Sequence, residues 1–109
     1  MKMSNKRGKL IRDKIPEIIL KNKRIPKTRT LNKSEYLREL KKKLIEETKE
    51  LLESKNKKEI INESSDVLEI VDALAEYYGI TFEQVVKNKE KKKKERGGFR
   101  KKTYLVRIK

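Results

Sequence analysis

Apolar residues recur at helical spacing along two long stretches of the chain, residues 34–54 and 58–78. A period of about 3.6 residues is typical of an amphipathic helix, with one face packed and the other in water. The first stripe is Leu37, Leu40, Leu44, Ile45, Leu51 and Leu52, and the second is Ile60, Val67, Ile70, Val71, Leu74 and Tyr78. The pattern therefore predicts two long helices separated by a short turn.

Two shorter helices are predicted at either side of this pair. A helix over residues 15–21 carries Pro16 in its first turn, where proline is tolerated. Thr81 and Gln84 have the spacing of a capping box, which predicts the start of a helix over residues 82–95.

Helix-capping residues and a β-prone segment complete the expected architecture. Ser34 is the predicted N-cap of the first long helix, and Gly79 suits the position that follows the second. Residues 103–108 are β-prone and predict a short strand. We expect an all-α fold, a helical bundle of about four helices with a possible short C-terminal strand, in a single domain over residues 1–109.

Composition narrows the chemistry. The chain has no Cys and no His, which excludes disulfides, thiolate chemistry, and both the commonest general base and the commonest zinc ligand. Only 34% of its 109 residues are hydrophobic, a small share for a self-sufficient core, so we expect a homo-oligomer. No apolar run is long enough for a membrane span, and we expect a soluble, cytoplasmic protein without membrane association.

The net charge of +15 is unevenly distributed. Residues 1–45 hold 16 Lys and Arg against 4 Asp and Glu, and residues 87–109 hold 12 against 2. Residues 46–86 reverse the balance, with 4 basic against 11 acidic side chains. An acidic centre between basic ends suits an anionic ligand that arrives with a metal ion, as a nucleoside triphosphate does.

The acidic centre contains two pairs of carboxylates at helical spacing. Glu47 and Glu50 lie three residues apart in the first long helix, and Glu63 and Asp66 in the second, so each pair shares a side of its helix. Glu47 and Glu63 interrupt the apolar stripes, whereas Glu46 points largely to the other side. Four acids brought together need a compensating cation, and Mg²⁺ or Mn²⁺ prefers oxygen ligands. The alternative to a metal site is that these acids have no shared role, because Glu is common in helices.

Lysine and arginine are concentrated in the last predicted helix. Lys89, Lys92 and Arg96 are spaced to share one face and are candidate phosphate ligands, with Gly97 and Gly98 allowing close approach of backbone amides. For most lysines of this tract, a solvated helix face is the simpler interpretation.

The N-terminal segment over residues 9–19 mixes charged and apolar residues. Arg12 and Lys14 are candidate phosphate ligands, because arginine and lysine commonly bind phosphate. A structural arm that packs Leu10, Ile11 and Ile15 on the helices explains the segment better.

Four segments together resemble a known family. They are K-L-I-R-D-K-I-P-E-I-I at residues 9–19, E-E-T-K-E at 46–50, E-S-S-D at 63–66 and E-R-G-G-F at 95–99. In this order they resemble the MazG-like, all-α nucleoside triphosphate pyrophosphohydrolases, and within them the small phosphoribosyl-ATP pyrophosphohydrolase-like members.

The resemblance implies a dimeric or tetrameric helical bundle that hydrolyses the α–β phosphoanhydride of a nucleotide with Mg²⁺. By the same resemblance, Glu47, Glu50, Glu63 and Asp66 hold metal, and Glu46, Glu47 or another of these acids orients or deprotonates water. Lys89, Lys92 and Arg96 would contact phosphates.

Two other functions remain open at the level of sequence. A small basic helical protein could bind nucleic acid through residues 1–33 and 87–109, which the net charge favours. A structural helical partner or antitoxin-like module would also tolerate a small core. Neither explains the acids on the apolar stripes.

Overall fold

The computed structural model describes residues 8–109, and within this range the chain forms helices and no strand. The helices are α1 (Ile15–Lys21), α2 (Lys33–Glu53), α3 (Lys57–Tyr77) and α4 (Phe82–Arg96). The all-α prediction is confirmed. The possible strand at residues 103–108 is not formed, because no second strand lies beside it to complete the hydrogen-bond ladder.

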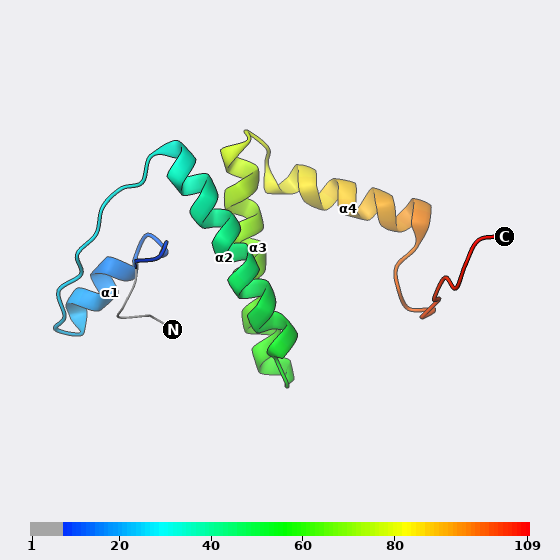
Figure 1. Ribbon diagram of the computed structural model, residues 1–109, viewed down its shortest axis with the longest axis horizontal. Coiled ribbons are helices and arrows are strands. Elements are labelled where there is room, and N and C mark those ends of the chain that lie inside the picture. Colours follow the sequence, from blue (N-terminus) through cyan, green and yellow to red (C-terminus); the bar gives the residue numbers. More distant parts are fainter. Residues whose placement is uncertain (1–7) are drawn as a thin grey trace.

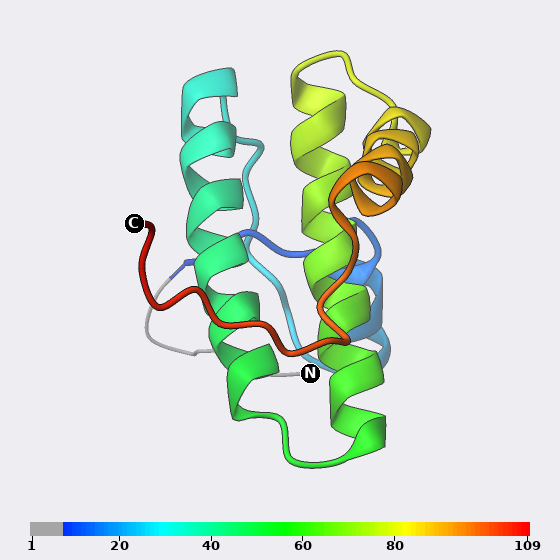
Figure 2. The same ribbon diagram turned by 90° about the vertical axis from the view of Figure 1, so that its right-hand side faces the viewer.

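Helices α2 and α3 form an antiparallel hairpin, joined by a loop of residues 54–56 (Figures 1 and 2). Leu40 of α2 and Ile70 of α3 are the most enclosed side chains of the pair, at 3% and 6% exposure. Both belong to the predicted apolar stripes. The hairpin therefore buries part of each predicted stripe, whereas Ile45 and Leu52 of the first stripe remain 71% and 81% exposed.

Side-chain caps define where the long helices begin. The N-cap of α2 is Asn32, not Ser34. The side chain of Asn32 accepts a hydrogen bond from the backbone amide of Glu35, and the side chain of Glu35 accepts one from the backbone amide of Asn32. Asn56 caps α3 in the same way by accepting the amide of Glu59. These bonds satisfy backbone donors that have no partner inside a helix.

The boundaries of α4 agree with the sequence. Thr81 and Gln84 form the expected capping box, and Gly79 precedes it with a φ of +72°, a value that glycine adopts without a steric penalty. The helix ends at Gly97, whose φ is +82°.

The N-terminal segment lies against one side of the hairpin. Residues 8–14, which we call the N-terminal strap, lead into α1, and Figure 1 places both on the opposite side of the hairpin from α4. Ile15 is buried, and Leu10 and Ile11 are half-buried. The burial of these three apolar side chains is what the predicted structural arm requires.

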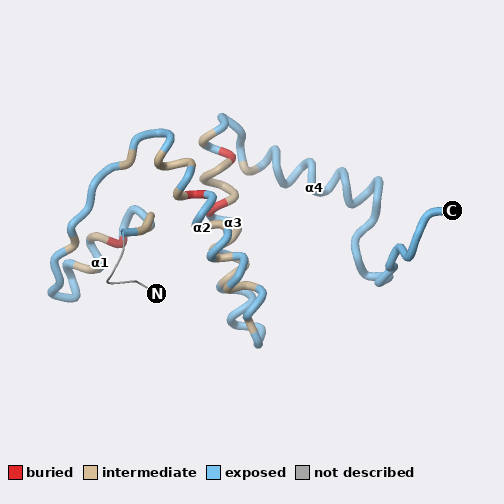
Figure 3. The backbone as a smooth tube through the Cα atoms, viewed as in Figure 1, coloured by how far each residue is buried: buried red, intermediate tan, exposed pale blue. Residues whose placement is uncertain are grey.

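Helix α4 extends away from the hairpin and carries the C-terminal segment with it (Figures 1 and 2). The Cα radius of gyration is 17.9 Å, against about 13 Å for a compact domain of this length. Figure 3 shows that burial is confined to the start of α1 and to the hairpin, and no residue of α4 is buried. One chain therefore leaves many large apolar side chains exposed.

Candidate active site and metal centre

Three carboxylates converge between α2 and α3. Glu47 and Glu50 come from α2 and Glu63 comes from α3, and one oxygen from each lies within 4.8 Å of the others. The spacing of three residues aims both α2 acids at α3, and the antiparallel hairpin brings Glu63 opposite them. We call these three residues the acid cluster. All three side chains are half-buried.

The acid cluster is electrostatically incomplete. One oxygen of Glu47 and one of Glu63, Oε2 in each case, are buried without a hydrogen-bond partner. Burial, followed by the neighbouring Glu63 and Glu50, raises the pKa of Glu47 from 4.5 to about 7. Buried, unpartnered carboxylate oxygens beside further acids are costly, and a cation would relieve this cost.

Lys43 is a partial counter-ion for the acid cluster. Its Nζ lies 3.7 Å from Glu47 Oε1, one helical turn away on α2, and lowers the pKa of Glu47 against the larger effect of burial. Lys43 was not among the predicted site residues, although its position four residues before Glu47 indicates this pairing.

The donor set fits a hard divalent cation. Carboxylate oxygens are the ligands that Mg²⁺ and Mn²⁺ prefer, and the two unpartnered oxygens supply coordination capacity that no protein group uses. A pocket at the loop end of the hairpin is lined by Glu50, Glu53, Ser54, Glu59 and Glu63, so solvent reaches the acid cluster from that end. The acid cluster therefore fits a metal site.

Asp66, the fourth acid of the motif, lies outside the acid cluster. Arg12 Nη2 donates to Asp66 Oδ1 at 2.7 Å, which joins the N-terminal strap to α3. Asp66 is only one helical turn beyond Glu63, so it borders the cluster while bound to a cation of the protein itself.

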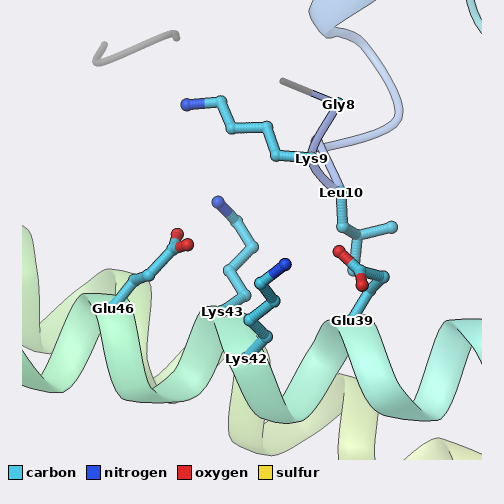
Figure 4. A pocket seen from close by; sticks show the side chains of 7 residues that line it. All are labelled: Gly8, Lys9, Leu10, Glu39, Lys42, Lys43 and Glu46. Carbon is cyan, nitrogen blue, oxygen red and sulfur yellow. The ribbon is translucent and has the colours of Figure 1, made fainter. Parts of the chain in front are cut away.

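Glu46 faces a different part of the surface from Glu47. It is exposed and lines a pocket between α2 and the strap (Figure 4). The other lining residues are Gly8, Lys9, Leu10, Glu39, Lys42 and Lys43. In Figure 4 the side chains of Lys42 and Lys43 rise from α2 towards the strap, so Glu46 has a strongly basic setting.

The basic residues of α4 are remote from the acids of the same chain. Lys89, Lys92 and Arg96 are exposed, and Lys89 pairs with Glu90 at 3.2 Å. The acid cluster lies near the loop end of the hairpin, whereas α4 starts from its other end. From Glu63 to Tyr77 alone, α3 rises about 21 Å, and α4 then points away from the hairpin (Figure 1). One chain does not bring the two groups together.

A helical hairpin in which carboxylates from both helices converge defines a class of all-α proteins suited to chemistry on phosphate groups. Over residues 7–93 the sequence matches the family described as phosphoribosyl-ATP pyrophosphohydrolase. This is most of the chain, and the chain therefore belongs to this MazG-like family. No curated protein and no solved structure gives a significant match.

Membership of the family establishes the general reaction. The chain is a nucleotide pyrophosphohydrolase, an enzyme that acts on phosphoanhydrides, and it has a cluster of acids that fits a metal ion. Between Gly8 and Lys109, no helix has the length and apolar character needed to cross a membrane.

Proposed function

We propose that the protein is an Mg²⁺-dependent nucleoside triphosphate pyrophosphohydrolase that cleaves the α–β phosphoanhydride to a nucleoside monophosphate and pyrophosphate. The acid cluster is the observation that carries this proposal. Two buried carboxylate oxygens without partners, in a family of pyrophosphohydrolases, are best explained by a divalent ion that binds with the nucleotide.

Glu47, Glu50 and Glu63 would hold the ion, and Asp66 would join them after leaving Arg12. Mg²⁺ or Mn²⁺ bound there neutralises phosphate charge and lowers the pKa of a coordinated water. The residues of the chain then orient the reactants. Glu46 or Glu47 would position the attacking water or accept its proton, and the place of Glu47 inside the acid cluster supports Glu47 for this role.

The phosphate ligands in our proposal are Lys89, Lys92 and Arg96. Because they extend away from the acids of their own chain, they would act on the acid cluster of a second chain in a homodimer or homotetramer. The exposed apolar surface supports such an assembly: Ile45 and Leu52 of α2 are 71% and 81% exposed although both belong to the predicted apolar stripe. Each chain would contribute a single domain.

The substrate class follows from the family and the charge distribution. Phosphoribosyl-ATP and nucleoside triphosphates share the polyphosphate chain that the basic residues and a divalent ion would bind. Either class fits, and a cytoplasmic location, where such nucleotides are abundant, remains a prediction.

A nucleotide screen tests this function. We would incubate the protein with phosphoribosyl-ATP, the common triphosphates and oxidised or deaminated triphosphates, with Mg²⁺ or with EDTA, and measure pyrophosphate. We expect Mg²⁺-dependent pyrophosphate release from at least one nucleotide. If no nucleotide is consumed, the metal-dependent function is wrong, and binding of nucleic acid by the basic segments becomes the better explanation.

A further inference from the structure

The ion pair between Arg12 and Asp66 connects the N-terminal strap to the acid motif. The two residues are 54 positions apart in the chain, and their atoms lie 2.7 Å apart. Arg12 is thus bound to Asp66, an acid that the proposed metal site would need as a ligand. Helical spacing does not account for this pairing, because the two residues belong to different segments of the fold.

The backbone of Arg12 is fixed within the fold, whereas its side chain is held only by the exposed ion pair with Asp66. The Ile15 amide donates to the Arg12 carbonyl at 3.0 Å, and Ile15 itself is buried. The side chain of Arg12 is 54% exposed and that of Asp66 is 32% exposed. Arg12 is therefore kept beside α3 by its neighbours, and its guanidinium group is free to change partner.

The chemistry of the pair favours such a change. An ion pair this exposed contributes little to folding stability, so it is easily broken. A guanidinium fork matches a phosphate as well as it matches a carboxylate. If Asp66 turned towards a metal ion at the acid cluster, Arg12 would lose its carboxylate partner one helical turn from Glu63 and would be available to a phosphate.

We propose that Arg12 is an exchangeable counter-ion: it holds Asp66 in the metal-free protein and binds a substrate phosphate once Asp66 has become a metal ligand. This inference rests on the proposed function. It assigns a phosphate ligand to the N-terminal strap of the same chain, in addition to the cations of α4, and it couples metal binding to the availability of that ligand.

If Arg12 exchanges Asp66 for a substrate phosphate, replacing Arg12 should have opposite effects on the affinity for metal and on the affinity for nucleotide. We would measure Mn²⁺ binding to the nucleotide-free protein by electron paramagnetic resonance, and the KM for the best Mg²⁺–nucleotide found in the screen. In Arg12→Gln the competitor for Asp66 is gone, so Mn²⁺ should bind several-fold more tightly. The KM should rise about tenfold, because a charge-assisted hydrogen bond to phosphate is lost.

A second variant separates charge from geometry. Arg12→Lys keeps the positive charge but loses the fork, so we expect Mn²⁺ affinity close to that of the parent and a smaller increase in KM. Arg29→Gln is the matched control, since Arg29 forms a similarly exposed pair with Glu35 at 2.9 Å away from the acid cluster. It should change neither quantity.

The outcomes distinguish this inference from the proposed function. If the parent binds Mn²⁺ and turns over nucleotide but Arg12→Gln weakens Mn²⁺ binding, or leaves both quantities unchanged, the exchange is wrong and the enzyme assignment stands. Unfolding of Arg12→Gln would also overturn the exchange, because the pair would then be structural. If the parent neither binds Mn²⁺ nor consumes nucleotide, the proposed function itself fails.

Discussion

At the scale of single residues, the acid cluster is an unfavourable arrangement that a cation makes favourable. Glu47 and Glu63 each bury an oxygen without a partner, and Lys43 is 3.7 Å from only one of these acids. A structure that needed only stability would replace such acids with apolar side chains. Their presence on the apolar stripes is what makes them functional candidates.

Replacing Glu63 should separate activity from folding. Glu63→Gln keeps the shape and removes one charge, and we expect activity to fall by about two orders of magnitude or more as metal affinity and phosphate neutralisation are lost together. The metal-free melting temperature should stay the same or rise, because repulsion among the acids decreases. Steady-state kinetics and thermal melts in EDTA measure the two effects.

Glu76→Gln is the control for this substitution. Glu76 is an exposed acid of the same helix outside the acid cluster, and its replacement should leave both quantities nearly unchanged. Equal activity in the Glu63 and Glu76 variants would contradict a role of Glu63 in binding metal.

The raised pKa of Glu47 predicts how stability varies with pH in the absence of metal. Between pH 4.5 and about 7 the folded protein retains a proton on Glu47 that the unfolded chain has released. Stability from this residue is therefore complete at low pH and is lost as pH rises through about 7.

Denaturant unfolding in EDTA across this pH range measures the effect. The parent should lose free energy of unfolding relative to Glu47→Gln as pH rises from 4.5 to 7, because glutamine does not titrate. Parallel curves for the two proteins would show that the carboxyl group of Glu47 is not buried among acids in solution.

Much of the acid cluster could be predicted at this scale, because residues three apart on a helix share a side. The spacing of Glu47, Glu50 and Glu63 and the apolar stripes were sufficient to bring these three together. The partner of Asp66 was not predictable, since Arg12 reaches it across the fold rather than along a helix.

At the scale of elements, the helix boundaries were largely predictable and one cap was not assigned correctly. Ser34 is the predicted N-cap, but Asn32, two residues earlier, is of an equally favourable type and is the cap in the structure. The residue three positions after Asn32 is Glu35, which completes a capping box, whereas Leu37 follows Ser34 at that spacing. The spacing between Asn32 and Glu35 is therefore the feature of the sequence that indicates the true start of α2.

Substitution of the two candidates tests the cap. Asn32→Ala should lower the free energy of unfolding by about 1 kcal/mol, because the Glu35 amide loses its acceptor. Ser34→Ala should have a much smaller effect, since the Ser34 hydroxyl donates to Asn32 and caps no amide. Urea denaturation compares them, and an equal or larger loss in Ser34→Ala would place the start of α2 elsewhere.

At the scale of the whole molecule, the chain resembles part of an assembly. Among the described residues only Ile15, Leu40, Ile70 and Ala75 are buried apolar side chains. Ile61 and Leu68 of α3 are exposed as well as Ile45 and Leu52 of α2, and each pair is spaced seven residues apart, so each helix has an uncovered apolar side. Hydrophobic periodicity predicted one apolar stripe on each helix, which did not include Ile61 and Leu68, and it does not tell which apolar residues meet within one chain.

We therefore expect a dimer or tetramer in solution. Burying these exposed side chains of the hairpin against another copy would remove apolar area from water. Light scattering at micromolar concentration should give a mass of two or four times 13.0 kDa. A monodisperse monomer would contradict the assembly.

Mixing variants tests whether the assembly completes the site. Glu63→Gln and Arg96→Gln should each be nearly inactive, and their mixture should recover part of the parent activity if α4 of one chain serves the acid cluster of another. No recovery after refolding the two together would indicate that each site is built from one chain.

The identity of the products tests the central claim most directly. Phosphorus-31 nuclear magnetic resonance of the reaction with the best nucleotide from the screen distinguishes the bond that is broken. Cleavage at the α–β phosphoanhydride predicts signals of a nucleoside monophosphate and pyrophosphate that appear with Mg²⁺ and not with EDTA. A nucleoside diphosphate and orthophosphate, or products that form equally in EDTA, would contradict the account.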